Sequence, residues 1–236
     1  MMLPTARGRV RRTAVLFAAA AMLMGGCSSG SDSSDAESEK AGMPASNLCD
    51  GSLDAAAQEA LQRLAGAKRF EEATGVNQAG RPNKFSVSRA VKHLHDEYRN
   101  QSECSVYYVG DDRPLFQVRF LASESYPSGK GDSGERKTRY PIGVFAQVGS
   151  NGADLFFRCP TDAPTKDAYT GDTDYVKAEM YRDTYRLRGD AEARDTMVIL
   201  NSMARAVAEA AGCASQAGLP TRVPDASRPP ASAAAR

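Results

Sequence analysis

Four cysteines constrain the fold of this chain more than any other feature of its sequence: Cys49, Cys104, Cys159 and Cys213. Each lies at the end of an expected helix or strand, and no two of them form a Cys-x-x-Cys pair. In an exported protein this arrangement indicates two disulfide bonds, and a metal site built from four separate cysteines is the alternative. Four cysteines allow three pairings, so the order of the strands bears on which bonds form.

The N-terminus indicates export. It begins with a cationic segment that has no acidic residue and carries Arg7, Arg9, Arg11 and Arg12. An apolar run of eleven residues follows at residues 14–24. At about 1.5 Å per helical residue this run spans roughly 16 Å, well short of a hydrocarbon core about 30 Å thick. It therefore predicts a signal peptide over residues 1–26 and not a transmembrane helix.

Cys27 directly follows Gly25 and Gly26 at the end of this apolar run. The junction resembles the lipobox of bacterial lipoproteins, although Met24 stands where that family usually has Leu, and Leu23 lies one position earlier. The resemblance implies that Cys27 receives a diacylglyceryl group and becomes the first residue after cleavage. Because two acyl chains give stable anchoring, it also implies a location at the cell membrane, facing the extracytoplasmic side.

Composition divides the rest of the chain into three parts. Residues 27–47, rich in Ser, Gly, Asp and Glu, predict a lipidated cysteine followed by a disordered tether. Residues 48–218 are long enough for one domain with its own core. Residues 219–236, rich in Pro and Ala, predict a disordered tail. Without the signal peptide, 26 basic residues face 29 acidic ones, and this balance argues against nucleic acid as a partner.

Hydrophobic periodicity predicts an α+β domain. Helices are expected at residues 52–65, 86–100, 175–187 and 190–211, the third being ambiguous between helix and strand. Strands are expected at residues 105–109, 115–122, 142–148 and 154–159. Because no helix interrupts them, these strands predict a four-stranded antiparallel meander sheet covered by helices.

The predicted sheet favours one disulfide pairing. The start of the first strand and the end of the fourth lie three strands apart, about 14 Å, whereas a disulfide needs Cα atoms about 5.5 Å apart. A Cys104–Cys159 bond is therefore disfavoured. Cys49–Cys104 with Cys159–Cys213 keeps both loops local, and each bond would add about 4 kcal/mol in the loop-entropy model. The third pairing, which joins Cys49 to Cys159, stays open.

No set of residues predicts a catalytic, cofactor or metal site. The Gly-Asp-Ser-Gly run at residues 131–134 resembles the serine motif of trypsin-like proteases, but Glu135 and Arg136 follow where that family has Gly-Pro. His93 and His95 are the only histidines, and on a helix they point about 200° apart. We interpret the Gly-Asp-Ser-Gly run as part of a Gly/Ser loop, and we place His95 on a solvated face. We expect no catalytic residue, no cofactor and no metal.

A long basic loop is the remaining candidate site. Residues 123–140 join two expected strands through eighteen residues, far more than the two to five of ordinary hairpins. The basic residues in its second half are Lys130, Arg136, Lys137 and Arg139. On an otherwise acidic chain they could bind anionic polymers or lipid headgroups, and a plain insertion is the alternative.

The layout as a whole resembles the uncharacterised secreted lipoproteins of streptomycete type in actinobacteria. The resemblance rests on the N-terminal signal, the Ser/Asp tether, the Cys-Asp-Gly-x-Leu run at residues 49–53, and the segment at residues 200–213 that ends in Gly-Cys. It covers nearly the whole chain and implies an envelope location without a substrate.

We therefore expect a membrane-anchored, non-enzymatic binding or assembly module of the cell envelope. Its expected partners are the lipid bilayer, through diacylglyceryl-Cys27, and an envelope protein or an anionic wall polymer. A small solute-binding protein is one alternative, although the absence of tryptophan argues against stacking on sugars. A cell-wall-acting hydrolase is another, with Glu97, Asp111 and Asp112 as paired carboxylates.

Replacing Cys27 with Ala is expected to move the protein from the membrane fraction to the medium, because the thiol that carries the acyl chains is removed. Cell fractionation combined with lipid labelling measures the change. Continued membrane retention of the variant, with unchanged lipid labelling, would contradict the predicted anchor.

Overall fold

The computed structural model describes residues 42–78, 80–128, 137–188 and 192–227. Three predicted site residues, Cys27, Lys130 and Arg136, lie outside these ranges, as does the Gly-Asp-Ser-Gly run at residues 131–134. Their roles stay predictions. Within the described ranges, no helix combines the length and the apolar character needed to cross a membrane.

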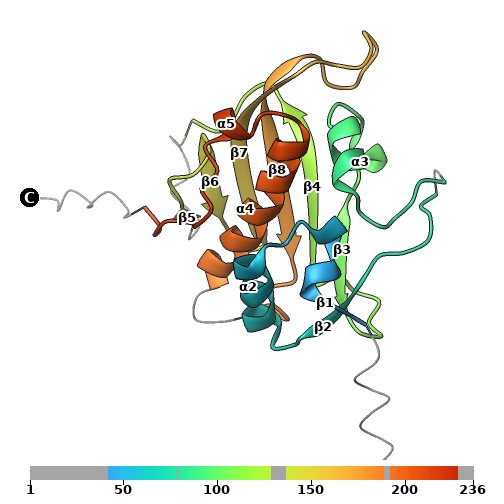
Figure 1. Cartoon of the computed structure of the whole chain (residues 1–236), viewed down its shortest axis with the longest axis vertical. Helices are drawn as coiled ribbons and strands as arrows, with labels where there is room; N and C mark the ends of the chain where they lie inside the picture. The colour runs from blue at the N-terminus through green and yellow to red at the C-terminus, as the bar shows by residue number, and fades with distance from the viewer. Residues whose placement is uncertain (1–41, 79, 129–136, 189–191, 228–236) are drawn as a thin grey trace, which may run out of the picture. The chain divides into compact units, whose positions relative to one another are not determined.

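One antiparallel sheet of eight strands forms the described domain (Figure 1). The strands are β1 (Met43–Pro44), β2 (Arg69–Glu72), β3 (Cys104–Tyr108), β4 (Phe116–Ser123), β5 (Thr138–Arg139), β6 (Phe145–Val148), β7 (Gly152–Thr161) and β8 (Thr173–Arg182). Their spatial order is β1-β2-β3-β4-β8-β7-β6-β5. The sheet thus consists of two four-stranded meanders, β1–β4 and β5–β8, that are joined through β4 and β8.

The predicted four-stranded meander is wrong, because β1, β2, β5 and β8 were not predicted as strands and β8 changes the strand order. Residues 175–187 were expected to form a helix, but Val176, Ala178 and Met180 are buried on one face, and Lys177 between them points to the other. This period of two is that of a strand. Strand β8 lies between β4 and β7, whereas the predicted sequential order had placed the strand at residues 142–148 beside β4.

The helices cover one face of the sheet (Figure 1). They are α2 (Ala55–Ala65), α3 (Val87–Lys92), α4 (Glu192–Ala210) and α5 (Ala214–Ala217), with short 3₁₀ turns η1 (Ala45–Asn47), η2 (Cys49–Gly51) and η3 (Tyr98–Asn100). Helix α2 begins after Asp54, whose carboxylate accepts a hydrogen bond from Ala57 N, and ends at Gly66 in the left-handed conformation. The predicted second helix is shorter than expected, because α3 ends at Lys92.

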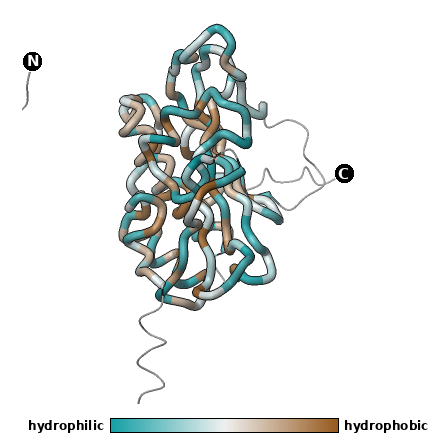
Figure 2. Tube along the Cα trace, turned by 90° about the vertical axis from the view of Figure 1, so that its right-hand side faces the viewer, coloured by the Kyte–Doolittle hydropathy of each residue, from teal (hydrophilic) through white to brown (hydrophobic). Residues whose placement is uncertain are grey.

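The core lies between these helices and the sheet. Helix α4 contributes the stripe that its spacing predicted, and Met197, Leu200, Met203 and Val207 are all fully buried. The sheet contributes large aromatic side chains, among them Phe116 of β4. Figure 2 shows the hydrophobic stretches in the middle of the domain and hydrophilic loops toward its ends.

Two disulfides join the helical layer to the sheet. Cys49 in η2 pairs with Cys104 in β3, and Cys159 in β7 pairs with Cys213 between α4 and α5. The Cα separations are 5.5 and 5.2 Å. This is the pairing that the loop argument favours. Although the sequential strand order was wrong, Cys104 and Cys159 still lie three strands apart, because β4 and β8 separate their strands.

The folded domain extends beyond both of its expected boundaries. Residues 42–47, assigned to the tether, contain β1 and the buried Ala45. At the other end, Val223 is buried, although residues 219–236 were expected to be a disordered tail. Arg194 of α4 donates a hydrogen bond to the carbonyl of Val223, and Ser227 N donates to Arg139 O of β5. The described part of the tail is therefore packed against the domain.

Gly152 allows β7 to approach β8 closely, because an added Cβ would lie 1.9 Å from Met180 O. Gly152→Ala is expected to lower the free energy of unfolding by about 1–3 kcal/mol, as overpacked sites do. Chemical denaturation measures the change. Gly171→Ala is the matched control, since nothing lies within 4 Å of its added Cβ, and its effect should stay within about 0.5 kcal/mol. Equal stabilities for the two variants would contradict the close approach.

Candidate functional site

The sheet face opposite the helices carries the candidate site, and we call it the open face. Successive side chains of a strand point to opposite faces, so every second residue of β4, β8, β7 and β6 belongs to it. A row of polar residues crosses five strands on this face, because each residue is the direct Cα partner of the next. This polar row consists of Arg119 (β4), Glu179 (β8), Asp154 (β7), Gln147 (β6) and Arg139 (β5).

Arg119 anchors one end of the polar row. Its guanidinium pairs with Glu103, and its Nε lies 3.6 Å from Glu179 Oε1. The Tyr98 ring packs against it, with the guanidinium carbon 3.4 Å from the ring centroid. Burial lowers the pKa of Arg119, and the charge of Glu179 opposes that effect. Arg119 is therefore held in place by two carboxylates and one aromatic ring.

Lys177 of β8 links the next two carboxylates of the row. Its Nζ lies 2.9 Å from Asp154 Oδ1 and 2.7 Å from Glu179 Oε2. Burial of the ammonium lowers its pKa, but the hydrogen bond to Glu179 and the charge and hydrogen bond of Asp154 outweigh burial, so the net shift is upward. The charges of the row thus compensate one another across β4, β8 and β7.

An aromatic pair lies beside the polar row. Phe145 of β6 and Phe156 of β7 are direct Cα partners, and their rings meet edge to face with centroids 5.8 Å apart. The guanidinium of Arg139 lies 4.8 Å from the Phe145 centroid. Arg139, at the end of the polar row, therefore packs against the Phe145 ring.

A cavity of about 410 Å³ opens over the polar row. Arg119, Gln147 and Glu179 line it from the sheet, and the β6–β7 turn at residues 149–152 closes one side. Tyr98 and Tyr181 also line it, and they are 60% and 54% exposed. The volume falls within the roughly 300–1,000 Å³ of small-ligand sites.

Gln147 is the unusual residue of this cavity. The residue is only 8% exposed, and its Oε1 has no hydrogen-bond partner among the residues that the structure describes. An unpaired buried polar atom costs about 1–3 kcal/mol. The terminal amide torsion of Gln is soft, so a rotation of this amide toward the cavity would present the oxygen to a donor.

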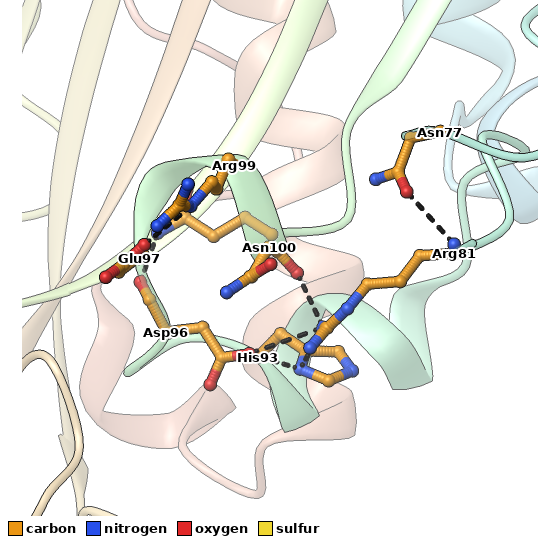
Figure 3. A network of polar contacts seen from close by, with 8 residues as sticks. Asn77, Arg81, His93, Asp96, Glu97, Arg99 and Asn100 are labelled. Atoms are coloured by element: carbon orange, nitrogen blue, oxygen red, sulfur yellow. Dashed lines mark hydrogen bonds and ion pairs between the residues drawn. The ribbon is translucent and has the colours of Figure 1, made fainter. Parts of the chain in front are cut away.

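A second polar cluster surrounds Arg81 (Figure 3). Arg81 Nη1 donates to the carbonyl of Asn100 at 3.0 Å, and Asn77 Oδ1 accepts from Arg81 N at the same distance. His93 Nδ1 lies 2.8 Å from Asp96 Oδ2, which also pairs with Arg81 at 3.4 Å. These contacts tie the loop before α3 to the turns after it.

This cluster does not assemble the contacts of a catalytic triad. Ser102 lies near His93 around a smaller cavity of about 160 Å³, but its Oγ accepts from Ser86 N. Within the described residues, no hydrogen bond joins Ser102 to His93, as a nucleophile and its base would require. The expected solvated position of His95 is wrong, because this side chain is buried, with Nδ1 2.9 Å from Gly171 O.

The structure separates the carboxylates that sequence reasoning had grouped for a hydrolase. Glu97 precedes β3 and pairs with Arg99, as Figure 3 shows. Asp111 follows β3 and pairs with Arg186. They therefore lie at opposite ends of one strand and do not form a pair.

The basic loop is connected to the open face through its described members. Lys137 lines the cavity, and Arg139 ends the polar row. Sequence reasoning missed the cavity itself, because the cavity exists only where β8 lies between β4 and β7. The signal that could have revealed it is the alternation of apolar and polar residues within 173–182, where Val176, Ala178 and Met180 alternate with Lys177 and Glu179.

No family model matches this chain, and no curated protein or solved structure matches it either.

Lys177 provides a test of the charge network. Because its folded pKa is raised above the ordinary 10.5, the protonated form is favoured by folding. This contribution to stability is full below pH 10.5 and is lost as the pH rises through the folded pKa. Glu179→Gln is expected to lower the pKa of Lys177, as measured by an NMR pH titration.

Glu71→Gln is the control for this titration, because Glu71 lies on β2, away from the network. It should leave the pKa of Lys177 unchanged. An equal shift in both variants, or no shift in Glu179→Gln, would contradict the paired arrangement.

Proposed function

We propose that this chain is a membrane-anchored extracytoplasmic lipoprotein whose folded domain is a non-enzymatic binding module of the cell envelope. The observation that carries the binding role is the cavity of about 410 Å³ over the polar row. The anchor rests on the Gly-Gly-Cys junction at Cys27.

The arrangement of charges favours binding over catalysis. Asp154 and Glu179 are the carboxylates closest to what a glycoside hydrolase needs, since they face each other across β7 and β8. One of the two would have to act as a proton donor, in an environment different from that of the other. Here the Lys177 ammonium contacts both carboxylates, so neither has the distinct environment that a proton donor needs. We therefore do not propose a hydrolase.

The single sheet also favours a binding module over a transport solute receptor. The helical face is occupied by the core, and the cavity lies on the open face and not between two lobes. Fourteen residues separate Cys27 from the first described residue. A chain of that length extends at most about 50 Å, which is enough for an anchored domain to reach material close to the membrane.

The test uses the exported Cys27→Ala protein, which retains the whole domain without acyl chains, and isolated cell envelopes. Asn151 lies exposed in the turn beside the cavity, so Asn151→Trp should fill the opening. We expect the Cys27→Ala protein, the parent in this comparison, to cosediment with envelopes. Adding Asn151→Trp should weaken the binding at least about tenfold, which is a loss of about 1.4 kcal/mol of binding free energy.

Thr165→Trp is the matched control, because it adds the same ring at an exposed loop position that does not line the cavity. It should bind as the parent does. Failure of the parent to bind envelopes would overturn the binding role, and equal loss in both Trp variants would remove the site from the cavity.

A further inference from the structure

We propose that the cavity on the open face binds a neutral oligosaccharide. This inference rests on the proposed function, since it names the ligand class of the same site. Three features of the cavity carry it: the compensation of its charges, its planar hydrogen-bonding groups and its two exposed tyrosine rings.

The charges argue for a neutral ligand. Two basic and two acidic side chains line the cavity among the described residues, namely Arg119, Lys137, Asp154 and Glu179. Arg119 is held by Glu103 and Glu179, and Lys177 holds Asp154 and Glu179. An ionic ligand would have to compete with these existing pairs. A neutral ligand leaves them intact and uses their remaining hydrogen-bonding capacity.

The hydrogen-bonding groups suit hydroxyls. Carboxylates accept only, guanidinium groups donate only, and amides do both, whereas a sugar hydroxyl both donates and accepts. The cavity presents all three kinds of group, in Glu179, Arg119 and the amides of Gln117 and Gln147. Gln147 Oε1 is buried and has no partner within the described part of the chain, so a hydroxyl donor from the ligand would satisfy it once the amide rotates toward the cavity.

The tyrosines supply surfaces for the apolar faces of sugar rings. Tyr98 packs against Arg119 and remains 60% exposed, and Tyr181, the Cα partner of Gln117, is 54% exposed. An exposed aromatic ring beside polar groups combines apolar contact with a wet edge. The absence of tryptophan argued against sugars from the sequence, but these two rings provide the stacking surface that tryptophan would otherwise supply.

The position of the cavity argues against an extended peptide. Peptides that add to a sheet pair their main chain with an exposed edge strand. The cavity lies over β4, β8, β7 and β6, which are all interior strands with neighbours on both sides in the sheet. A ligand over these strands is recognised by their side chains, as an oligosaccharide is.

The experiment titrates the purified protein with a chitin tetrasaccharide and a cellulose tetrasaccharide by calorimetry. A polyanionic wall polymer serves as the charged alternative. We expect binding of at least one neutral tetrasaccharide, unchanged when the salt rises from about 0.05 to about 0.5 M, because no ion pair with the ligand is screened. Tyr98→Ala and Tyr181→Ala should each weaken binding at least about tenfold.

Gln147→Leu separates recognition from folding. It removes the buried amide while keeping a side chain of similar size, so the thermal midpoint should stay equal or rise while saccharide binding is lost. Tyr185→Ala is the control, because Tyr185 is 81% exposed and does not line the cavity. Its saccharide affinity should match that of the parent.

Three results would overturn the inference. The first is absence of binding to both neutral tetrasaccharides at about 1 mM, and the second is salt-sensitive binding of the polyanion alone. The third is saccharide binding that survives in the Tyr98, Tyr181 and Gln147 variants. If the parent protein binds envelopes and Asn151→Trp does not, only the ligand class fails. If the parent protein does not bind envelopes, the binding module fails as well.

Discussion

The pairing of β4 with β8 is the interaction on which the rest of the structure depends. Eight consecutive residue pairs, from Phe116–Arg182 to Ser123–Tyr175, join the two meanders into one sheet. This register buries alternate residues under the helices and places Arg119 directly beside Glu179. A shift of one residue would move every side chain of β8 to the opposite face, so that charged residues would enter the core. The fold and the cavity therefore depend on the same ladder of hydrogen bonds.

The charged residues of the open face illustrate how a sheet tolerates one uncovered side. Lys177, Glu179 and Asp154 lie in neighbouring strands, where like charges would repel and opposite charges attract. Asp154 and Glu179 are direct partners of like charge, and Lys177 contacts both of them, while Arg119 lies beside Glu179. Each carboxylate therefore has an opposite charge as a neighbour. Partial burial makes these contacts less sensitive to salt than pairs on a fully exposed surface. The polar row thus contributes to the stability of the sheet and also forms the floor of the cavity.

Local patterns in the sequence predicted much of the helical layer. The apolar stripes of α2 and α4 stand out, because their apolar residues recur at a regular helical period. Strand β8 was missed because Lys177 and Glu179 on its open side are charged, and such residues in a short segment fit an exposed helix as well as a strand. His95 was misplaced for a related reason. Its ring lies against the loop that contains Thr170 and Gly171, whose carbonyls are at hydrogen-bond distance from Nδ1, and this loop is remote in sequence. The cavity needs five strands in register, and no single segment contains that information.

If the chain is held at its N-terminus, as we propose, the Cys49–Cys104 bond has a mechanical consequence. A pull from that side first meets β1, which joins β2 through only two residue pairs at the edge of the sheet. Such an edge would peel under load, because its few hydrogen bonds open one after another. Five residues beyond β1, however, the chain is covalently bonded to β3. The load therefore passes into the interior of the sheet, and the strands beneath the cavity are shielded from unzipping that begins at the edge.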